Sequence, residues 1–309
     1  MSSVSLFKTE YTTIENIEQL SNKLGEPEWL LQRRKRAFES FLDLPYDQDT
    51  LFYKYTNFRK LDPQKLTPMW EIEETNVFPK DDSVPTSIEL DSSIQIKLND
   101  EMKSKGVILM SIQDLVKTDE DLAKKIITKI DSFSDNFDKL GLLARTFAIN
   151  TLVLYVPKGV ILEKPIFKEI YNTQGAFNSF NEFIGYFEQD TQLEIREIFR
   201  NIPETKSSAD QVYTSMNTLY LEDNSNVKHS QVQAWEDNVL HIMSKVVNLQ
   251  NYAKLVSLTH LQGGQMTRQN SLINLTGRGS EGYDLFINFG NERQRFDVKS
   301  NCSSCIVSY

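Results

Sequence analysis

The sequence predicts an α+β protein in which a helical first half is followed by an array of short β-strands. Before about residue 150, apolar residues recur at helical spacing; after it, strand-length apolar or alternating runs are separated by Gly, Asn, Asp and Pro turns. Glycine also rises from three residues in 1–150 to nine in 151–309. We therefore expect a mostly helical region with an extended connector over residues 1–148, and a β-domain over residues 149–309.

The first helix is expected over residues 12–24. Isoleucine and leucine side chains recur there at helical spacing and form one apolar stripe. Thr12 and Glu15 have the spacing of a capping box at the N-terminal end. Gly25 follows the last apolar residue, where a glycine commonly ends a helix.

The second helix is expected over residues 27–44. Pro27 suits the first turn, because the N–H that proline lacks would have no partner there. Aromatic and aliphatic side chains then recur at helical spacing until Pro45 ends the run. The helix also carries a basic cluster, which we interpret as a solvated face, with contact to an acidic partner as the alternative: Arg33, Arg34, Lys35 and Arg36.

A proline-rich stretch and a further helix complete the first half. Residues 46–105 have no sustained period and predict an extended connector, with a short strand where residues 93–98 alternate polar and apolar. Residues 118–147 return to a helical pattern. The acidic run 119–121 lies near the expected N-terminal end, where the helix dipole favours negative charge.

The second half predicts strands bounded by turn residues. We place them near 151–156, 160–171, 180–188, 193–200, 212–221, 227–234, 239–249, 253–261, 266–275, 283–289 and 294–299. Three architectures could produce this pattern: an antiparallel sandwich, a barrel or a stacked β-solenoid. The recurring interval between runs of similar length favours stacking. The last strand-like run is expected to give way to an unsupported tail from Asn301.

Composition excludes several classes of function. The net charge of −9 divides into −6 over residues 1–150 and −3 over 151–309, so no cationic stripe is present to neutralise nucleic-acid phosphates. The N-terminus lacks the layout of a signal peptide, and no apolar run approaches the roughly 20 residues that span a bilayer. Only two cysteines are present. We expect a cytoplasmic protein that binds neither nucleic acid nor membrane.

Two short motifs are compatible with cofactor or metal binding. Gly277–Gly282 matches G-x-G-x-x-G letter for letter, but strand-like residues follow it where a dinucleotide site requires a helix, so we interpret it as a turn. Cys302 and Cys305 form a C-x-x-C pair. One such pair cannot complete a tetrahedral metal site, and the histidines lie far upstream. We expect no metal role for this pair.

The remaining polar residues do not assemble a recognisable active site. His229, His241 and His260 lie in or beside expected strands and are interpreted as surface or packed structural residues. No G-x-S-x-G, H-E-x-x-H or G-x-x-x-x-G-K-[ST] motif occurs. The sequence therefore predicts no catalytic, cofactor-binding or metal-binding residue.

Three stretches resemble one known family. Gly25–Leu31, followed by two arginines and Ala37-Phe38, resembles the N-terminal signature of the SufB/SufD family of iron–sulfur cluster assembly proteins. Lys54–Leu61 is similar to the K-Y-T segment of the SufD branch. Tyr155–Val160, with Leu162 and Pro165, is similar to the Y-V-P-K-G-V entry into the family's β-domain. The resemblance covers essentially residues 20–300 in the same order and spacing.

The resemblance implies a right-handed parallel β-helix flanked by helical segments, within a complex with a SufB-like paralogue and a SufC-like ABC ATPase. Iron–sulfur clusters are built on that complex, so this chain alone is expected to hold no cofactor and the cluster only transiently. Family members continue through further turns to a C-terminal helical domain, which is expected to be absent here. The family's assembly-site residues lie in those later turns, and no position in this sequence matches them.

Three functional hypotheses follow. The first is a non-enzymatic scaffold subunit of a SUF-type assembly complex, with homodimerisation left open. The second is a β-solenoid enzyme acting on carbohydrates, which would need grouped carboxylates on one face. The acidic residues of the expected strands show no such grouping: Glu169, Glu194, Glu197 and Asp284. The third is a fragment, truncated or frame-shifted near Asn301, without a function of its own.

Overall fold

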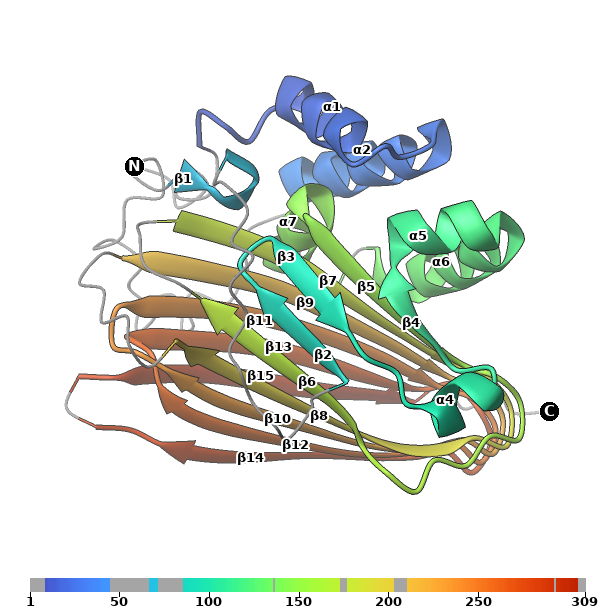
Figure 1. The fold of residues 1–309 in the computed structure, drawn as a ribbon. Helices are drawn as coiled ribbons and strands as arrows, with labels where there is room; N and C mark the ends of the chain where they lie inside the picture. The colour runs from blue at the N-terminus through green and yellow to red at the C-terminus, as the bar shows by residue number, and fades with distance from the viewer. Residues whose placement is uncertain are drawn as a thin grey trace.

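The computed structural model describes residues 9–44, 67–71, 86–135, 137–172, 177–202, 210–291 and 293–304. Over these residues a helical region precedes a parallel β-solenoid, which confirms the predicted fold class (Figure 1). The Lys54–Leu61 segment and Cys305 lie outside the described residues. The division into two domains at residue 148 stays a prediction.

The two N-terminal helices form as expected, apart from one cap. α1 (Ile14–Lys23) ends before Gly25, whose φ of 65° lies in the left-handed region that glycine adopts without strain. The predicted capping box at Thr12 was wrong: Thr13 is the N-cap, and its side chain accepts a hydrogen bond from the backbone N–H of Asn16. α2 (Glu28–Asp43) begins directly after Pro27.

The single helix expected over residues 118–147 is instead two helices, α6 (Glu120–Ser134) and α7 (Lys139–Phe147), and a further helix, α5 (Ile112–Thr118), precedes them. Asp119 separates α5 from α6 and caps α6 by accepting from the N–H of Leu122. Asp138 precedes α7, where its carboxylate accepts hydrogen bonds from Ser244 and Arg268 of the solenoid. The break at Asp138 therefore follows from contacts with distant residues, which helical periodicity does not reveal.

The connector contributes the first strands of the sheets. It contains β1 (Thr67–Pro68), the 3₁₀ helix η4 (Met69–Glu71), β2 (Ser87–Leu90), β3 (Ser93–Ile96), α4 (Asp100–Ser104) and β4 (Ile108–Ser111). β3 confirms the strand predicted near residue 93. β2 and β3 form an antiparallel hairpin, and β2 also pairs in parallel with the first strand of one solenoid sheet.

The solenoid chain passes alternately through two sheets. The sheet that we call the odd sheet contains β5 (Asn150–Val156), β7 (Phe177–Phe187), β9 (Gln211–Leu221), β11 (Val239–Leu249), β13 (Met266–Leu275) and β15 (Arg295–Ser304). The even sheet contains β6 (Ile166–Asn172), β8 (Gln192–Asn201), β10 (Asn226–Trp235), β12 (Lys254–Gly263) and β14 (Glu281–Phe289). Strands of successive turns pair in parallel, and each turn uses roughly 30 residues. This pairing rules out the antiparallel sandwich and the barrel.

Two strands differ from their predicted bounds. β6 begins at Ile166 rather than near residue 160, because Pro165 has no N–H to donate to a ladder. β15 continues to Ser304, so the expected unsupported tail from Asn301 was wrong: Asn301 pairs with Leu272 and Cys302 with Ile273. The backbone N–H and C=O groups of these polar residues pair with β13, so the strand continues although its side chains show no apolar alternation.

The helices cover the outer face of the odd sheet. Figure 1 shows α1, α2, α5, α6 and α7 on one side of the solenoid. Phe38 and Phe41 of α2 pack with Phe147 of α7 and Phe180 of β7, and α6 places Ile126 and Ile130 in a cluster with residues of β5, β7 and β9. Because strands β7, β9 and β11 are covered on both faces, nearly every residue in them is buried.

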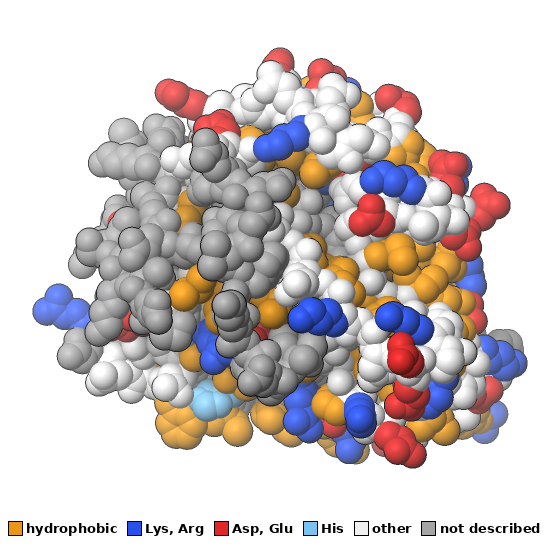
Figure 2. Space-filling model, in the orientation of Figure 1, with side chains coloured by type: hydrophobic (Ala, Val, Ile, Leu, Met, Phe, Trp, Pro, Cys, Tyr) orange, Lys and Arg blue, Asp and Glu red, His pale blue; other side chains and the backbone are white. Residues whose placement is uncertain are grey.

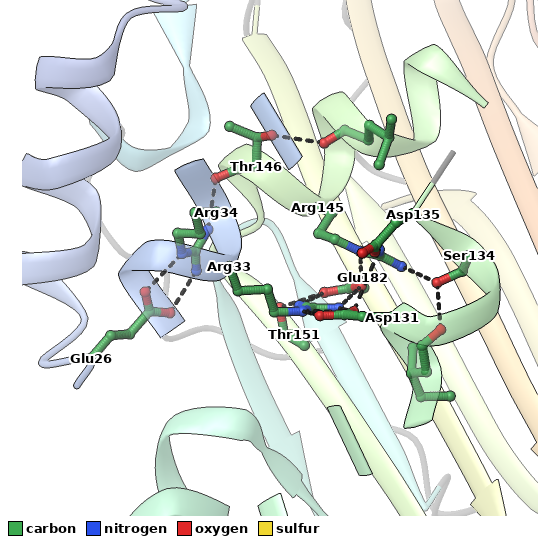
Figure 3. A network of polar contacts seen from close by, with 12 residues as sticks. Glu26, Arg33, Arg34, Asp131, Ser134, Asp135, Arg145, Thr146, Thr151 and Glu182 are labelled. Atoms are coloured by element: carbon green, nitrogen blue, oxygen red, sulfur yellow. Dashed lines mark hydrogen bonds and ion pairs between the residues drawn. The ribbon is translucent and has the colours of Figure 1, made fainter. Parts of the chain in front are cut away.

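A buried ionic junction ties these helices to the sheet (Figure 3). Arg33 of α2 donates to both carboxylate oxygens of Glu182 in β7, at 2.7 and 2.8 Å, and to Asp131 of α6 at 3.0 Å. Arg145 of α7 donates to the same Glu182 at 2.9 Å. The carboxylate of Glu182 thus joins arginines from two helices, and Asp131 brings α6 into the same network through those arginines.

The basic cluster on α2 was therefore misassigned. Arg33 and Arg34 are 5% and 4% exposed, and Arg34 is held by Glu26 at 2.6 Å and by the carbonyl oxygen of Thr146. Arg36 is exposed, as a solvated face requires. Sequence reasoning placed all four cations in solvent because their carboxylate partners are not neighbours on the same helix.

The positive charges of the two arginines stabilise the ionised form of Glu182. Burial alone would raise the pKa of Glu182, but the guanidinium groups of Arg33 and Arg145 outweigh it and lower the pKa to about 2. Since this value lies below that of an unfolded glutamate, the ionised pair contributes stability above about pH 4.5, which is lost as the pH falls toward 2.

Replacing Arg33 tests the junction. Arg33→Ala leaves Glu182 and Asp131 without their shared cation, although Arg145 remains, and we expect the free energy of unfolding to fall by about 3 kcal/mol. Arg36→Ala removes an exposed arginine of the same helix and should change it by less than about 0.5 kcal/mol. Urea denaturation followed by circular dichroism at pH 7 measures both. Equal effects of the two substitutions would contradict the assignment.

Candidate functional site: the polar interior of the solenoid

Between the two sheets, polar side chains form a band flanked by two apolar zones. One zone is aliphatic and includes Leu219, Val247 and Leu255. The other is aromatic and includes Tyr213 and Trp235. The band between them, which we call the polar column, consists of inward-facing side chains from successive turns: Lys168, Glu197, Asn217, His229, Gln231, Lys245, Ser257, Asp284 and Ser300.

The first part of the polar column is centred on Glu197 of β8. Its carboxylate accepts from Lys168 of β6 at 3.1 Å and lies 2.5 Å from Nε2 of His229 in β10. Asn217 of β9, in the opposite sheet, also donates to it. Lys168 makes a second ion pair with Glu89 of β2 at 3.3 Å. One ammonium group is therefore shared by two buried carboxylates.

The pKa values of the two carboxyl groups in this cluster, Glu197 and Glu89, are shifted in opposite directions. Burial tends to raise the pKa of Glu197, but Lys168 and His229 lower it to about 2. Burial raises the pKa of Glu89, because its single ammonium partner does not compensate for the loss of water. Burial tends to lower the pKa of Lys168, but the two carboxylates together raise it. At neutral pH Lys168 and Glu197 are thus a charged pair inside the protein.

A second ionic group lies further along the column. Lys245 of β11 donates to Ser257 of β12 at 2.6 Å and to Asp284 of β14 at 2.8 Å. Ser300 of β15 donates to the other oxygen of Asp284. Lys245 crosses the interior from the odd sheet to the even sheet, so this pair fixes the two sheets relative to each other.

His241 lies among aromatic rings at the margin of the polar column. Its Nδ1 accepts a hydrogen bond from the indole N–H of Trp235 at 3.0 Å, and its ring contacts those of Phe199 and Tyr213 at centroid distances of 5.1 and 5.2 Å. Burial lowers the pKa of His241 to about 3. The ring is therefore neutral at physiological pH.

Several interior polar atoms have no protein partner among the described residues. They include Nδ1 of His229, Oε1 of Gln231 and Oε1 of Gln269. Buried polar atoms of this kind are normally satisfied by ordered water. A hydrated interior is consistent with their position between the two sheets.

The four acidic residues considered from sequence occupy separate environments. Glu197 and Asp284 face the interior, where each is paired with a lysine. Glu169 accepts from Tyr171 and Arg200, and Glu194 pairs with Arg196 near the surface. Each of these carboxylates already has a partner, so the four do not include a pair of free carboxylates facing one cleft.

The other sequence candidates are placed as follows. Gly277–Gly282 spans the predicted turn between β13 and β14, and its last two residues are the first two of β14. His229 and His241 are fully buried and His260 is half-buried, in agreement with a structural role. Cys302 is exposed on β15. Among the described residues no three His, Cys, Asp or Glu side chains are grouped as a metal site.

Sequence reasoning missed Lys168, Glu197 and Lys245 as a set. The signal that could have found them is the alternation in each strand combined with the repeat of roughly 30 residues, which places polar residues of successive turns at the same inward position. Without the register, a lysine and a glutamate 29 residues apart look unrelated.

The architecture defines the class of protein: a parallel β-solenoid with a closed, charge-paired interior and a helical cover on one sheet. Comparison with known proteins agrees with this class. A model of the SufBD protein N-terminal region matches residues 7–167, and a model of the SUF system FeS cluster assembly SufBD core domain matches residues 170–304.

Curated relatives carry the same family name. The chain is 24% identical to an iron-sulfur cluster assembly SufBD family protein of Staphylococcus aureus (strain USA300), over 99% of this chain and 70% of the relative. It is 22% identical to one from Staphylococcus saprophyticus subsp. saprophyticus, with the same coverage. The chain belongs to the SufB/SufD family, and this membership supports a role in iron–sulfur cluster assembly.

Replacing Lys168 tests the charged pair in the polar column. Lys168→Met removes the cation between Glu89 and Glu197, and we expect the free energy of unfolding to fall by about 3–5 kcal/mol. Lys228→Met, on the exposed outer face of the same sheet, is the matched control and should have an effect below about 0.5 kcal/mol. Denaturant unfolding at pH 7 measures the difference. A loss below 1 kcal/mol for the Lys168 variant would show that the pair is not charged and buried as described.

The pH dependence of stability tests the neutral state of His241. Between pH 6.5 and about 3 the unfolded chain holds a proton on this ring that the folded chain does not, so acid favours unfolding in that window. The stability advantage of the wild type over His241→Gln should shrink by about 2 kcal/mol from pH 7 to pH 5. Denaturant unfolding at both pH values tests this, with His260→Gln as the half-buried control. A constant difference across the range would refute the neutral assignment.

Proposed function

We propose that this chain is a non-enzymatic scaffold subunit of a SUF-type iron–sulfur cluster assembly complex in the cytoplasm. Its partners in this proposal are a SufB-like paralogue and a SufC-like ABC ATPase. The observation that carries the proposal is the match of two consecutive family models to residues 7–167 and 170–304, in the order in which the helical region and the solenoid occur. The iron–sulfur cluster is cargo of the complex, held only transiently and not by this chain alone.

The interior geometry supports a scaffold more than an enzyme. The inward-facing carboxylates of Glu197 and Asp284 are ion-paired at 3.1 and 2.8 Å and enclosed between sheets. A group held in this way stabilises the turn-to-turn register, and a substrate would have to break the pair to reach it. A rigid solenoid then presents its outer surfaces to partners, as repeat proteins commonly do.

The carbohydrate-active alternative lacks its chemical requirement. A glycosidase needs two carboxyl groups on either side of the scissile bond, roughly 5–10 Å apart in an accessible cleft. Glu169, Glu194, Glu197 and Asp284 instead lie in separate ion pairs or hydrogen bonds. No described residue gives this alternative specific support.

Within the described residues, no helix is long and apolar enough to cross a lipid bilayer.

Affinity purification from native lysate tests the proposal. We expect the tagged full chain to recover a SufB-like and a SufC-like protein in stoichiometric amounts, because a scaffold acts through its complex. A tagged unrelated β-solenoid protein purified in parallel controls for non-specific capture. Recovery of neither partner, or turnover of a polyuronate or other glycan by the purified chain, would overturn the assignment.

A further inference from the structure

Helix α7 lies across the odd sheet and is fixed to strands that belong to different turns. Along its length it packs on β7, β9 and β11. The residue before its first turn, Asp138, reaches β11 and β13, whereas Arg145 in its last turn reaches β7. Because β9 and β11 lie between β7 and β13 in the sheet, one short helix joins strands of four successive turns.

The contact at the N-terminal end of α7 is a buried ion pair. Oδ2 of Asp138 accepts hydrogen bonds from Ser244 of β11 and, at 3.0 Å, from Arg268 of β13, and Oδ1 accepts from Arg268 at 3.2 Å. Burial tends to raise the pKa of Asp138, but Arg268 and Ser244 lower it, so the carboxylate is ionised at neutral pH. A bidentate pair of arginine and carboxylate is among the stronger and more directional side-chain contacts.

The contact at the C-terminal end of α7 is a second buried ion pair. Figure 3 shows Arg145 pointing from α7 toward Glu182 of β7, to which it donates at 2.9 Å. Arg145 also donates to Ser134 and Asp135 at the end of α6, and Glu182 accepts from Arg33 of α2. This end of α7 is therefore connected to two other helices that cover the sheet.

The length of α7 matches the span between its two contacts. Three intervals between neighbouring strands amount to about 14 Å, and the helical rise from Asp138 to Arg145 amounts to about 10 Å, which leaves the remainder to the side chains. Between the contacts α7 lies directly on β9 and β11, since a Cβ added at Gly141 would be 2.7 Å from Met216 and from Ser244. The helix is thus held at both ends and cannot move closer to the sheet.

We propose that α7 is a two-point brace, whose contacts at Asp138 and Arg145 make the helical cover (α1, α2, α5, α6 and α7) and these four turns open as one unit. Loss of the Arg268 contact leaves Asp138 buried without this cation, so the N-terminal end of α7 is displaced from the sheet to regain water. Because a short helix moves as a rigid element, the displacement weakens the contact between Arg145 and Glu182 at its other end. A change at β13 is thereby transmitted to α2 and α6. The proposal does not depend on the assignment to cluster assembly.

Charged side chains on the solvent face of the helical cover provide a comparison. Figure 2 shows Lys, Arg, Asp and Glu side chains at the surface where Figure 1 places α1, α2, α5 and α6. Lys117 and Asp114 of α5 form an ion pair at 3.2 Å, with side chains that are 67% and 59% exposed. Exposed pairs contribute little to stability, so removing this one should leave distant segments unchanged.

Hydrogen–deuterium exchange of the full chain, followed by mass spectrometry, tests the proposal with Arg268→Met. We expect the exchange rates of amides around Arg145, around Glu182 and in α2 to rise at least about tenfold, because these segments open together with the end of α7 that the substitution releases. Lys117→Met is the matched control and should change these rates by less than about twofold. An increase confined to β13 and the first turn of α7 would overturn the proposal.

A double-mutant cycle measures the coupling directly. In urea unfolding, the effect of Arg268→Met combined with Arg145→Met on the equilibrium constant should differ at least about fivefold from the product of the two single effects, whereas independent distant sites agree within about twofold. If Arg268→Met does not fold, Ser244→Ala removes one hydrogen bond from Asp138 and should still accelerate exchange around Arg145. A cycle that closes within about twofold, or unchanged exchange around Arg145 in the Ser244 variant, would contradict the brace.

Discussion

The parallel register between successive turns is the constraint on which the rest of the structure depends. Each strand pairs with the strand one turn away, so every inward side chain stacks on an inward side chain of the next turn. A shift of one strand by one residue would exchange its two faces, so that Lys168 and Glu197 would no longer lie on the same face. The buried ion pairs therefore specify one register, even though burying charges is costly in itself.

The two sheets have the same parallel strand arrangement but differ in what their outer faces carry. The odd sheet is covered by helices, and its outer face carries Glu182, which anchors Arg33 and Arg145 from separate helices. The even sheet has an outer face that changes from charged residues in β8 to apolar residues in β14. One flank thus supports the helical cover, while the outward side chains of β14 on the other flank are exposed.

A closed, ion-paired interior and differentiated outer faces suit a protein that works by holding other components together. Membership of the SufB/SufD family supports a role in iron–sulfur cluster assembly. His241 is likewise buried and neutral: the rings of Phe199, Tyr213 and Trp235 surround it and separate it from solvent.

Local chemistry made most of the secondary structure predictable. The strand runs near 212–221, 239–249 and 266–275 lie at or within one residue of β9, β11 and β13, since the turn residues between them leave little freedom for the strand ends. The turn at Gly277 was likewise read correctly, because a strand follows it. Helix ends were less certain: Thr13 rather than Thr12 caps α1.

The sequence by itself determined most of the segments that become helices and strands, because periodicity and turn chemistry act over a few residues, but it did not reveal the break before α7. Only the tertiary structure decided which charges are buried and paired. Arg33 and Glu182 are 149 residues apart in the chain, and Asp138 and Arg268 are 130 apart, so neither pairing leaves a local pattern. Coulombic attraction in a buried site depends on distance in space, and that distance exists only once the turns have stacked in register.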